Sequence, residues 1–304
     1  MNEIARLVVN GWPSSNHKTL ERWLFRTITK LKDEGKRTKF LITPGGFALG
    51  AFPKDWNNPH GWDSSDDLSQ LIACATPVVD QVVSMRVIKA ARNVVRYITL
   101  SIDLRSLQTP LHAELIAVID LRQSIIVNRS FTILKIVGWT GKSYPTMNQE
   151  NNLIHVTDPK THLFNLGNDR LIVLGCHDLN IFNGRSLANQ KPGGNRHRRS
   201  RSMLEAFYKF NPTHIIQHPH GTDTWRSWNQ SWNKVSRTFP NACWASAITY
   251  AAKQGSPRAS LKDVLARTHH EGQDSLNVVI RGSKKRSVLQ NAYLPPIAAR
   301  TMHA

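Results

Sequence analysis

Cysteine is scarce in this sequence, and long apolar runs are missing. The three cysteines are Cys74, Cys176 and Cys243, and none lies in a CxxC pair, so the sequence predicts neither a disulfide framework nor a zinc knuckle. The longest apolar runs, such as 115–121 and 171–176, are far shorter than the roughly 20 residues that a membrane helix needs. The start of the chain lacks the basic and apolar regions of a secretory signal. We therefore expect a cytoplasmic protein with no membrane association.

Acidic residues are also few. The chain of 304 residues has 21 Asp and Glu against 40 Lys and Arg, which gives a formal net charge of +19. A charge of this size attracts polyanions and anionic substrates over long range, but it does not define a fold. With 40% hydrophobic residues, 17 glycines and 15 prolines, the composition is that of a globular protein and excludes a mainly disordered chain.

Hydrophobic periodicity predicts helices and strands that alternate along the chain. Apolar residues recur at helical spacing in the segments 17–34, 78–95, 201–210 and 226–239. Short apolar or alternating segments predict strands at 39–43, 97–104, 112–119, 124–127, 170–175, 213–217 and 243–248. We expect a single α/β domain with mixed sheets over residues 1–281 and a basic C-terminal extension over residues 282–304.

One cysteine lies where α/β folds display catalytic residues. Cys176 follows the strand predicted at 170–175, at the point where the chain turns away. Nucleophiles occupy this carboxyl edge of the sheet in such folds, although an unpaired cysteine at a strand end is more often a small buried hydrophobic residue. Position alone makes Cys176 a candidate nucleophile.

Four blocks of sequence carry short motifs: residues 40–50 (FLITPGGFALG), 141–150 (GKSYPTMNQE), 175–182 (GCHDLNIF) and 212–247. In content and in order they resemble the motifs of the nitrilase, or carbon–nitrogen hydrolase, superfamily. The resemblance implies a single-domain αββα sandwich of the nitrilase type with mixed sheets.

The resemblance also implies the chemistry of the site. It makes Cys176 the nucleophile that attacks an amide or nitrile carbon, Lys142 the cation that stabilises the oxyanion, and Glu150 an orienting or assisting carboxylate. Lys135 competes with Lys142 for the role of catalytic lysine. An ordinary thiol, with a pKa of about 8.5, is mostly protonated at neutral pH and needs an adjacent base or cation. The resemblance further implies a small-molecule amide or nitrile substrate, no cofactor and a homodimer.

The first block departs from the superfamily at the general base. Gly45 stands where the resemblance places a glutamate, and glycine cannot accept a proton. Three explanations stay open: a base recruited from His177, His218 or His220, a changed reaction, or a catalytically silent protein that keeps its pocket for binding a nucleic acid, a nucleotide or another anionic partner. A Gly45→Glu variant would restore activity if only the base were missing.

Other residues are candidates for binding. Following the resemblance, we place His177, His220, Trp225 and Arg226 near the pocket, while Trp225, Trp228 and Trp232 share the spacing of one helix face and are expected in the core. The histidines between 214 and 220 have no acidic or cysteine partner at a recognised ligand spacing, so we predict no metal site.

The basic segment 189–202 is predicted to be an exposed loop. Its arginines Arg198, Arg199 and Arg201 are candidates for binding a nucleic acid or another anionic ligand, since such runs neutralise phosphates. They also follow Cys176 closely enough in the sequence to border the pocket and select anionic substrates.

Overall fold

The computed structural model describes residues 2–52, 65–106, 109–127, 132–145, 149, 152–184, 186, 190–252, 255–270 and 275–284. Its helices are α1 (His17–Asp33), α2 (Ser65–Val82), α3 (Met85–Ala91), α5 (Asn195–Phe210), α6 (Asn229–Thr238) and α7 (Leu261–Ala266), with short 3-10 helices η2 (Pro159–His162) and η3 (Asp178–Phe182). Its strands are β1 (Asn2–Asn10), β2 (Thr38–Ile42), β3 (Ala48–Ala51), β4 (Val95–Arg105), β5 (His112–Ile126), β6 (Thr132–Gly141), β7 (Leu153–Ile154), β8 (Leu163–Leu166), β9 (Asp169–Leu174), β10 (His214–Gln217), β11 (Cys243–Ser246), β12 (Ile248–Tyr250) and β13 (Leu276–Arg281).

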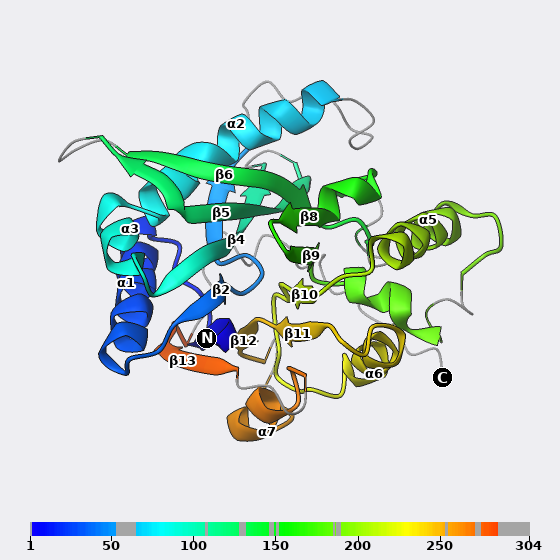
Figure 1. Ribbon diagram of the computed structural model, residues 1–304. Helices are drawn as coiled ribbons and strands as arrows, with labels where there is room; N and C mark the ends of the chain where they lie inside the picture. The colour runs from blue at the N-terminus through cyan, green and yellow to red at the C-terminus, as the bar shows by residue number, and fades with distance from the viewer. Residues whose placement is uncertain are drawn as a thin grey trace, which may run out of the picture.

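Two β-sheets pack face to face between two layers of helices (Figure 1). The larger sheet has the order β12-β1-β2-β4-β5-β6, with β13 beside β1, and the smaller has the order β11-β10-β9-β8. Both sheets contain parallel and antiparallel pairs. The expected αββα sandwich with mixed sheets is therefore confirmed by the layers of the chain itself.

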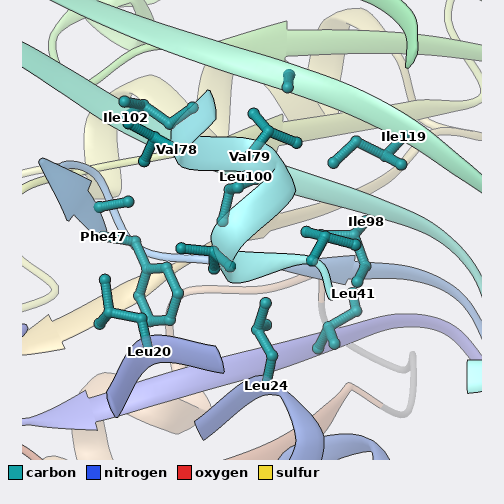
Figure 2. Packing of buried hydrophobic residues seen from close by; sticks show 14 of the residues in the cluster. Leu20, Leu24, Leu41, Phe47, Val78, Val79, Ile98, Leu100, Ile102 and Ile119 are labelled. Atoms are coloured by element: carbon teal, nitrogen blue, oxygen red, sulfur yellow. The ribbon is translucent and has the colours of Figure 1, made fainter. Parts of the chain in front are cut away.

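Each interface between layers has its own apolar core. Helix α1 buries one stripe of residues, including Leu20, Leu24 and Ile28, against the larger sheet. Figure 2 shows Leu20, Leu24 and Phe47 packed beneath the α2 residues Val78 and Val79. A second cluster lies between the smaller sheet and helices α5 and α6.

The two sheets meet through alternate residues of their central strands. Phe40 and Ile42 of β2 lie in one cluster with Leu171 and Val173 of β9 and Ile216 of β10. This period of two is the pattern of strands that bury a whole face against another sheet. This packing sets the position of one sheet, and so of the ends of its strands, relative to the other sheet.

Several strands bring polar residues to one common edge of the sandwich. Strands β9 and β10 are parallel, with Leu174 opposite Gln217, so the chain leaves both at the same end. In the larger sheet β4 and β5 are antiparallel, with Asp103 directly opposite Glu114. Strand β6 returns beside β5 and ends at Gly141 opposite Leu115. Residues distant in sequence therefore converge here.

The structure corrects several predicted elements. The helix predicted over 78–95 is wrong, because Ser84 accepts a hydrogen bond from Val87 N and starts the separate helix α3, and β4 already begins at Val95. The strands predicted at 112–119 and 124–127 form one strand, β5, whose pairing with β6 shifts register between Asp120 and Ile125.

Two further predictions change in the second half of the chain. The strand predicted at 243–248 divides into β11 and β12, which belong to different sheets. The basic segment 189–202 is only partly a loop, since α5 begins at Asn195. The C-terminal extension predicted at 282–304 lies almost wholly outside the described residues.

Within the described ranges, no single helix is long and apolar enough to cross a membrane. The segments Leu68–Val82 and Met85–Ala91 together have that length and composition, but the chain bends by 65° between them.

Candidate active site

Cys176 lies in a tight turn between β9 and η3, and only 5% of its surface is exposed. The carboxylate of Asp178 shapes this turn, because it accepts hydrogen bonds from the backbone N–H groups of Gly175 (2.7 Å), Ser143 (2.9 Å) and Tyr144 (2.7 Å). A Cβ atom on Gly175 would lie 2.9 Å from Lys142 Cα. The absence of a side chain at Gly175 therefore allows the segment that carries Lys142 to pass directly beside the nucleophile turn.

A chain of buried hydrogen bonds holds the carbonyl group of Cys176. Gln217 Nε2 donates to Cys176 O at 2.8 Å, and Gln217 Oε1 accepts from Ser246 Oγ at 2.7 Å. Ser246 Oγ in turn accepts from Trp232 Nε1 at 2.9 Å. Because Gln217 and Ser246 are fully buried, each lost bond would leave a polar group without a partner.

Lys142 is buried against the side chains of Glu114, on β5, and of Gln149, which lies between β6 and β7. Its Nζ atom donates to Glu114 Oε1 at 2.9 Å and to Gln149 Oε1 at 2.7 Å. Burial lowers the pKa of Lys142, but the charges of Glu114 and Cys176 outweigh it and raise the pKa above its ordinary value. Lys142 thus stays a cation beside the thiol.

The sequence left two candidates for the catalytic lysine, Lys135 and Lys142, and one candidate for the carboxylate, Glu150. Lys135 is exposed on β6, seven residues before Lys142, so the structure brings Lys142 rather than Lys135 to the site. Glu150 lies outside the described residues. The carboxylate that binds the Lys142 ammonium is that of Glu114.

Asp103 and Glu114 are two buried carboxylates placed side by side by the register of β4 and β5. Like charges directly opposite each other destabilise a sheet, and here cations compensate. Arg105 Nη2 donates to Asp103 Oδ2 at 3.1 Å, while Lys142 binds Glu114. These cations and His220 lower the pKa of both carboxyl groups, although burial alone would raise it.

His220 bridges the two carboxylates and the cysteine. Its Nε2 atom lies 2.9 and 3.0 Å from the two oxygens of Asp103, and its Nδ1 atom lies 3.6 Å from Glu114 Oε2. Its backbone N–H donates to Cys176 Sγ at 3.4 Å. Burial lowers the pKa of His220, but the charges of Asp103 and Glu114, with hydrogen bonds to Asp103 and Cys176, raise it well above its ordinary value.

The Cys176 thiol is poised to ionise. Burial raises its pKa, but the charge of His177 and hydrogen bonds from His177 and His220 bring the pKa well below its ordinary value. A thiolate, rather than a thiol, is the form that attacks carbon. The environment of Cys176 therefore favours the thiolate form.

Two neighbouring histidines remain neutral. Burial lowers the pKa of His218 to about 3 and that of His112 to about 4. His218 Nδ1 lies 2.6 Å from Thr43 O, so this nitrogen carries the ring proton and donates a hydrogen bond to the carbonyl oxygen. His218 thus joins the end of β10 to the loop after β2.

This loop contains Gly45, whose missing side chain now has a structural explanation. A Cβ atom on Gly45 would lie 2.4 Å from His218 O, 2.8 Å from Pro219 C and 3.0 Å from His220 N. Gly46, at φ +59°, would place a Cβ atom 2.8 Å from Asp103 Oδ2 and 2.9 Å from His220 Cδ2. The two glycines make the space that the backbone of 218–220 and the His220–Asp103 pair occupy.

The other predicted binding residues are not all at the site. His177 packs edge-on against Trp228, with ring centroids 5.5 Å apart, and interacts with Cys176. Trp225 instead lies between the guanidinium groups of Arg226 (5.8 Å) and Arg267 (4.6 Å). Trp228, which packs on His177 and lies in one apolar cluster with Cys176, is the tryptophan that the contacts place beside the site.

The arginines after the nucleophile bind their own chain. Arg199 donates to Ser143 O at 3.0 Å and pairs with His155, and Arg198 pairs with Gly193 O and Asn195 Oδ1. Arg201 is exposed. Arg199 therefore supports the segment that follows Lys142.

Sequence reasoning missed Asp103 and Glu114. The available signal was a lone acid inside each of two apolar segments, Ile102-Asp103-Leu104 and Ala113-Glu114-Leu115. A carboxylate in a buried strand requires a charged or hydrogen-bonding partner, so these acids pointed to cations at the same edge.

Among the described residues, no group of three or more His, Cys, Asp or Glu side chains is arranged to hold a metal ion.

Comparisons with known proteins give matches among solved structures alone. No protein-family model and no curated protein matches the chain. Among solved structures, the amidase of Nesterenkonia sp. AN1 matches at 13% identity and TM-score 0.47, covering 82% of this chain and 78% of the amidase. Nit3 of Saccharomyces cerevisiae, a member of branch 10 of the nitrilase superfamily, matches at 11% identity and TM-score 0.48, covering 84% of this chain and 78% of Nit3.

A mutant of the same amidase, described as coming from the nitrilase superfamily, matches at 12% identity and TM-score 0.47, covering 84% of this chain and 80% of that chain. At this level of similarity, the roles of individual residues depend on the contacts within this chain.

Proposed function

We propose that this protein hydrolyses carbon–nitrogen bonds of small amides or nitriles, with Cys176 as the nucleophile. The observation that carries the proposal is the buried pair of Cys176 and Lys142, brought together across Gly175, with the pKa of the thiol lowered and that of the ammonium raised. A thiolate and a fixed cation in one water-poor site suit attack on a carbon whose oxygen or nitrogen becomes negative.

The steps follow from this charge arrangement. The thiolate of Cys176 adds to the amide carbon, and the carbonyl electron pair moves to oxygen, where the Lys142 ammonium stabilises it. A proton passes to the nitrogen as this intermediate collapses, which expels a neutral amine and leaves a thioester on Cys176. Water then adds to the thioester and gives up a proton, which replaces the one used in the first step, and a second collapse releases the acid and restores the thiolate. Glu114 and Gln149 hold the Lys142 ammonium in place throughout.

A role in binding a nucleic acid or another anionic partner through Arg198, Arg199 and Arg201 stays a prediction. The contacts of Arg198 and Arg199 with their own chain favour the hydrolase, because they give these side chains a local structural role. Assembly as a homodimer and a cytoplasmic location likewise remain predictions.

The test is release of ammonia from a panel of small aliphatic and aromatic amides and nitriles. We expect the Cys176→Ser variant to lose at least about 10³-fold in kcat/KM. The matched control is Cys243→Ser, which changes a cysteine at the start of β11 and should keep most of the activity. Mass spectrometry should detect an acyl group on Cys176 in the wild type. Absence of both turnover and a Cys176 adduct across the panel would overturn the proposal.

A further inference from the structure

We propose that His220, oriented by Asp103, is the proton-transfer group of Cys176, so that a thiolate–imidazolium pair replaces the glutamate missing at Gly45. This inference rests on the proposed function, since it assigns a further catalytic residue to the same site. His220 is the catalytic residue, and Asp103 is a positioning residue that acts through it.

The first line of evidence is geometry. His220 lies beside Cys176, since its backbone N–H is 3.4 Å from Sγ, and hydrogen bonding from its side chain lowers the pKa of the thiol. The opposite side of the ring is held by Asp103, whose two oxygens both lie within 3.0 Å of Nε2. A nucleophile, an imidazole and an orienting carboxylate in this order form the arrangement by which cysteine and serine nucleophiles are activated.

The second line of evidence is the balance of charge at the buried edge. The groups that face Cys176 and His220 are Asp103 and Arg105 from β4, His112 and Glu114 from β5, Lys142 after β6, His177 and Asp178 after β9, and His218 after β10. The buried carboxylates Asp103 and Glu114 lie against the cations Arg105 and Lys142, and the third buried carboxylate, Asp178, is held by three backbone N–H groups instead of a cation. An ionised Cys176 adds one anion and a protonated His220 adds one cation, so the ion pair preserves the balance.

The other candidates for the base are less suitable. His218 stays neutral because burial lowers its pKa to about 3, and its Nδ1 proton is committed to Thr43 O. His177 also interacts with the thiol, but its ring packs on Trp228, and no carboxylate contacts it in the described part of the chain. Glu114 is a weak base, since Lys142 and His220 lower the pKa of its carboxyl group.

The third line of evidence is the space at Gly45 and Gly46. A side chain on either glycine would collide with the backbone of 218–220 or with the His220–Asp103 pair. A side chain at position 45 is therefore incompatible with the present position of the backbone that carries His220, because its Cβ atom would lie 2.4 Å from His218 O and 3.0 Å from His220 N.

Proton transfer through His220 balances at every step. The thiolate attacks, and the imidazolium gives its proton to the leaving nitrogen as the carbon–nitrogen bond breaks, which leaves a thioester, a neutral amine and neutral His220. His220 then takes a proton from the water that attacks the thioester. Expulsion of the Cys176 thiolate restores the thiolate–imidazolium pair and releases the acid.

Alkylation of Cys176 by iodoacetamide tests the pair without requiring hydrolysis. The rate is followed from about pH 5 to pH 10 by peptide mass spectrometry, which separates Cys176 from Cys74 and Cys243. Only roughly 1% of an ordinary thiol, with a pKa of about 8.5, is thiolate at pH 6.5. We expect the wild type to react at pH 6.5 nearly as fast as at pH 8.5.

The variants His220→Gln and Asp103→Asn should both move the alkylation profile toward that of an ordinary thiol. At pH 6.5 we expect rates that are roughly 10- to 100-fold lower, whereas near pH 10 all proteins should react within a few-fold of each other because every thiol is then ionised. Convergence at alkaline pH separates a change in ionisation from a change in folding or access. Asp103→Asn provides the second variant if His220→Gln does not fold.

Glu114→Gln is the comparison variant and should shift the profile less than His220→Gln, whereas His177→Gln should also slow alkylation at pH 6.5 because the charge of His177 lowers the pKa of the thiol. A larger shift for Glu114→Gln than for His220→Gln, or a wild-type profile typical of an ordinary thiol, would overturn the proposal. If the profile is as expected but no amide or nitrile is cleaved, the proposed function fails and the ion pair stands. If substrates are cleaved and His220→Gln leaves the profile unchanged, the ion pair fails and the function stands.

Discussion

Gly45 lies so close to His218 that a Cβ atom added to it would come within 2.4 Å of the His218 carbonyl oxygen. The neighbouring contact between Gly45 N and Pro219 O, at 3.0 Å, fixes this approach. The loop after β2 and the loop after β10 are therefore matched to each other, and a change in one moves the other.

Substitution of Gly45 should impair the protein rather than repair it. Gly45→Glu should lower the Cys176 alkylation rate at pH 6.5, because backbone at 218–220 must move and carries His220 with it. Overpacking of this kind costs about 1–3 kcal/mol, so the thermal unfolding midpoint should also fall. The control is Gly184→Ala, since a Cβ atom there has no neighbour within 4 Å. A gain in amide hydrolysis by Gly45→Glu would contradict this expectation.

Removal of the Lys142 ammonium should destabilise the fold. Lys142→Met leaves Glu114 buried without its closest cation, and such a loss costs about 3–5 kcal/mol. The double variant Lys142→Met/Glu114→Gln should recover part of that stability, because the uncompensated charge is gone. Urea unfolding of the two single variants and the double variant measures the coupling.

Lys209→Met is the control for this pair. Lys209 forms an exposed ion pair with Glu205 at 2.8 Å, and exposed pairs contribute little. Equal stability of Lys142→Met and wild type would show that Glu114 does not depend on the ammonium.

Acid should destabilise the protein through its neutral buried histidines. The folded-state pKa of His218 is about 3 and that of His112 is about 4, both lowered by burial, whereas the unfolded chain titrates near pH 6.5. The unfolded state thus binds more protons as the pH falls below about 6.5. Each histidine costs up to about 1.4 kcal/mol of stability per pH unit until its folded-state pKa is reached.

The variant His218→Asn isolates one of these contributions. Asparagine keeps an N–H donor near the position of Nδ1 and does not titrate, so the loss of stability between about pH 6 and pH 4 should shrink by about 1.4 kcal/mol per pH unit. Urea unfolding at several pH values gives the slope for each protein. An unchanged slope would mean that His218 is protonated in the folded state.

The hydrogen-bond chain behind the nucleophile should be costly to interrupt. Ser246→Ala removes the partner of both Gln217 Oε1 and Trp232 Nε1, and each buried unpaired group costs about 1–3 kcal/mol. Ser236→Ala is a matched control, because Ser236 accepts one bond from Trp244 Nε1 at a less buried position. Thermal unfolding should rank Ser246→Ala well below Ser236→Ala.

Local sequence signals predicted the layers better than they predicted the site. The stripe Leu20, Leu24 and Ile28 and the apolar strand before Cys176 identify their elements, because burial follows a period set by the backbone alone. Lys142 was also predicted, from a motif. Asp103 and Glu114 were not predicted. Their pairing depends on the register of β4 and β5, and a local sequence pattern carries no information about register.

The nucleophile's neighbours show the same limit. His177 adjoins Cys176 in the sequence, whereas His220 is 44 residues away and is brought there by the parallel pairing of β9 and β10. Trp225 was placed at the site and Trp228 in the core, yet Trp228 is the one that contacts His177. The helix expected over 226–239 begins only at Asn229, which changes where each ring points.

The pairing of β1 determines when this fold can be completed during synthesis. The first strand hydrogen-bonds to β2, but also to β12 and to β13, which ends at Arg281. As the chain leaves the ribosome, the backbone N–H and C=O groups on one side of β1 therefore lack their strand partner until more than 270 further residues have been translated. Contacts of such long sequence separation slow folding and prolong the exposure of strand edges. Chaperone binding to the unfinished chain should be relieved only once β13 has been made.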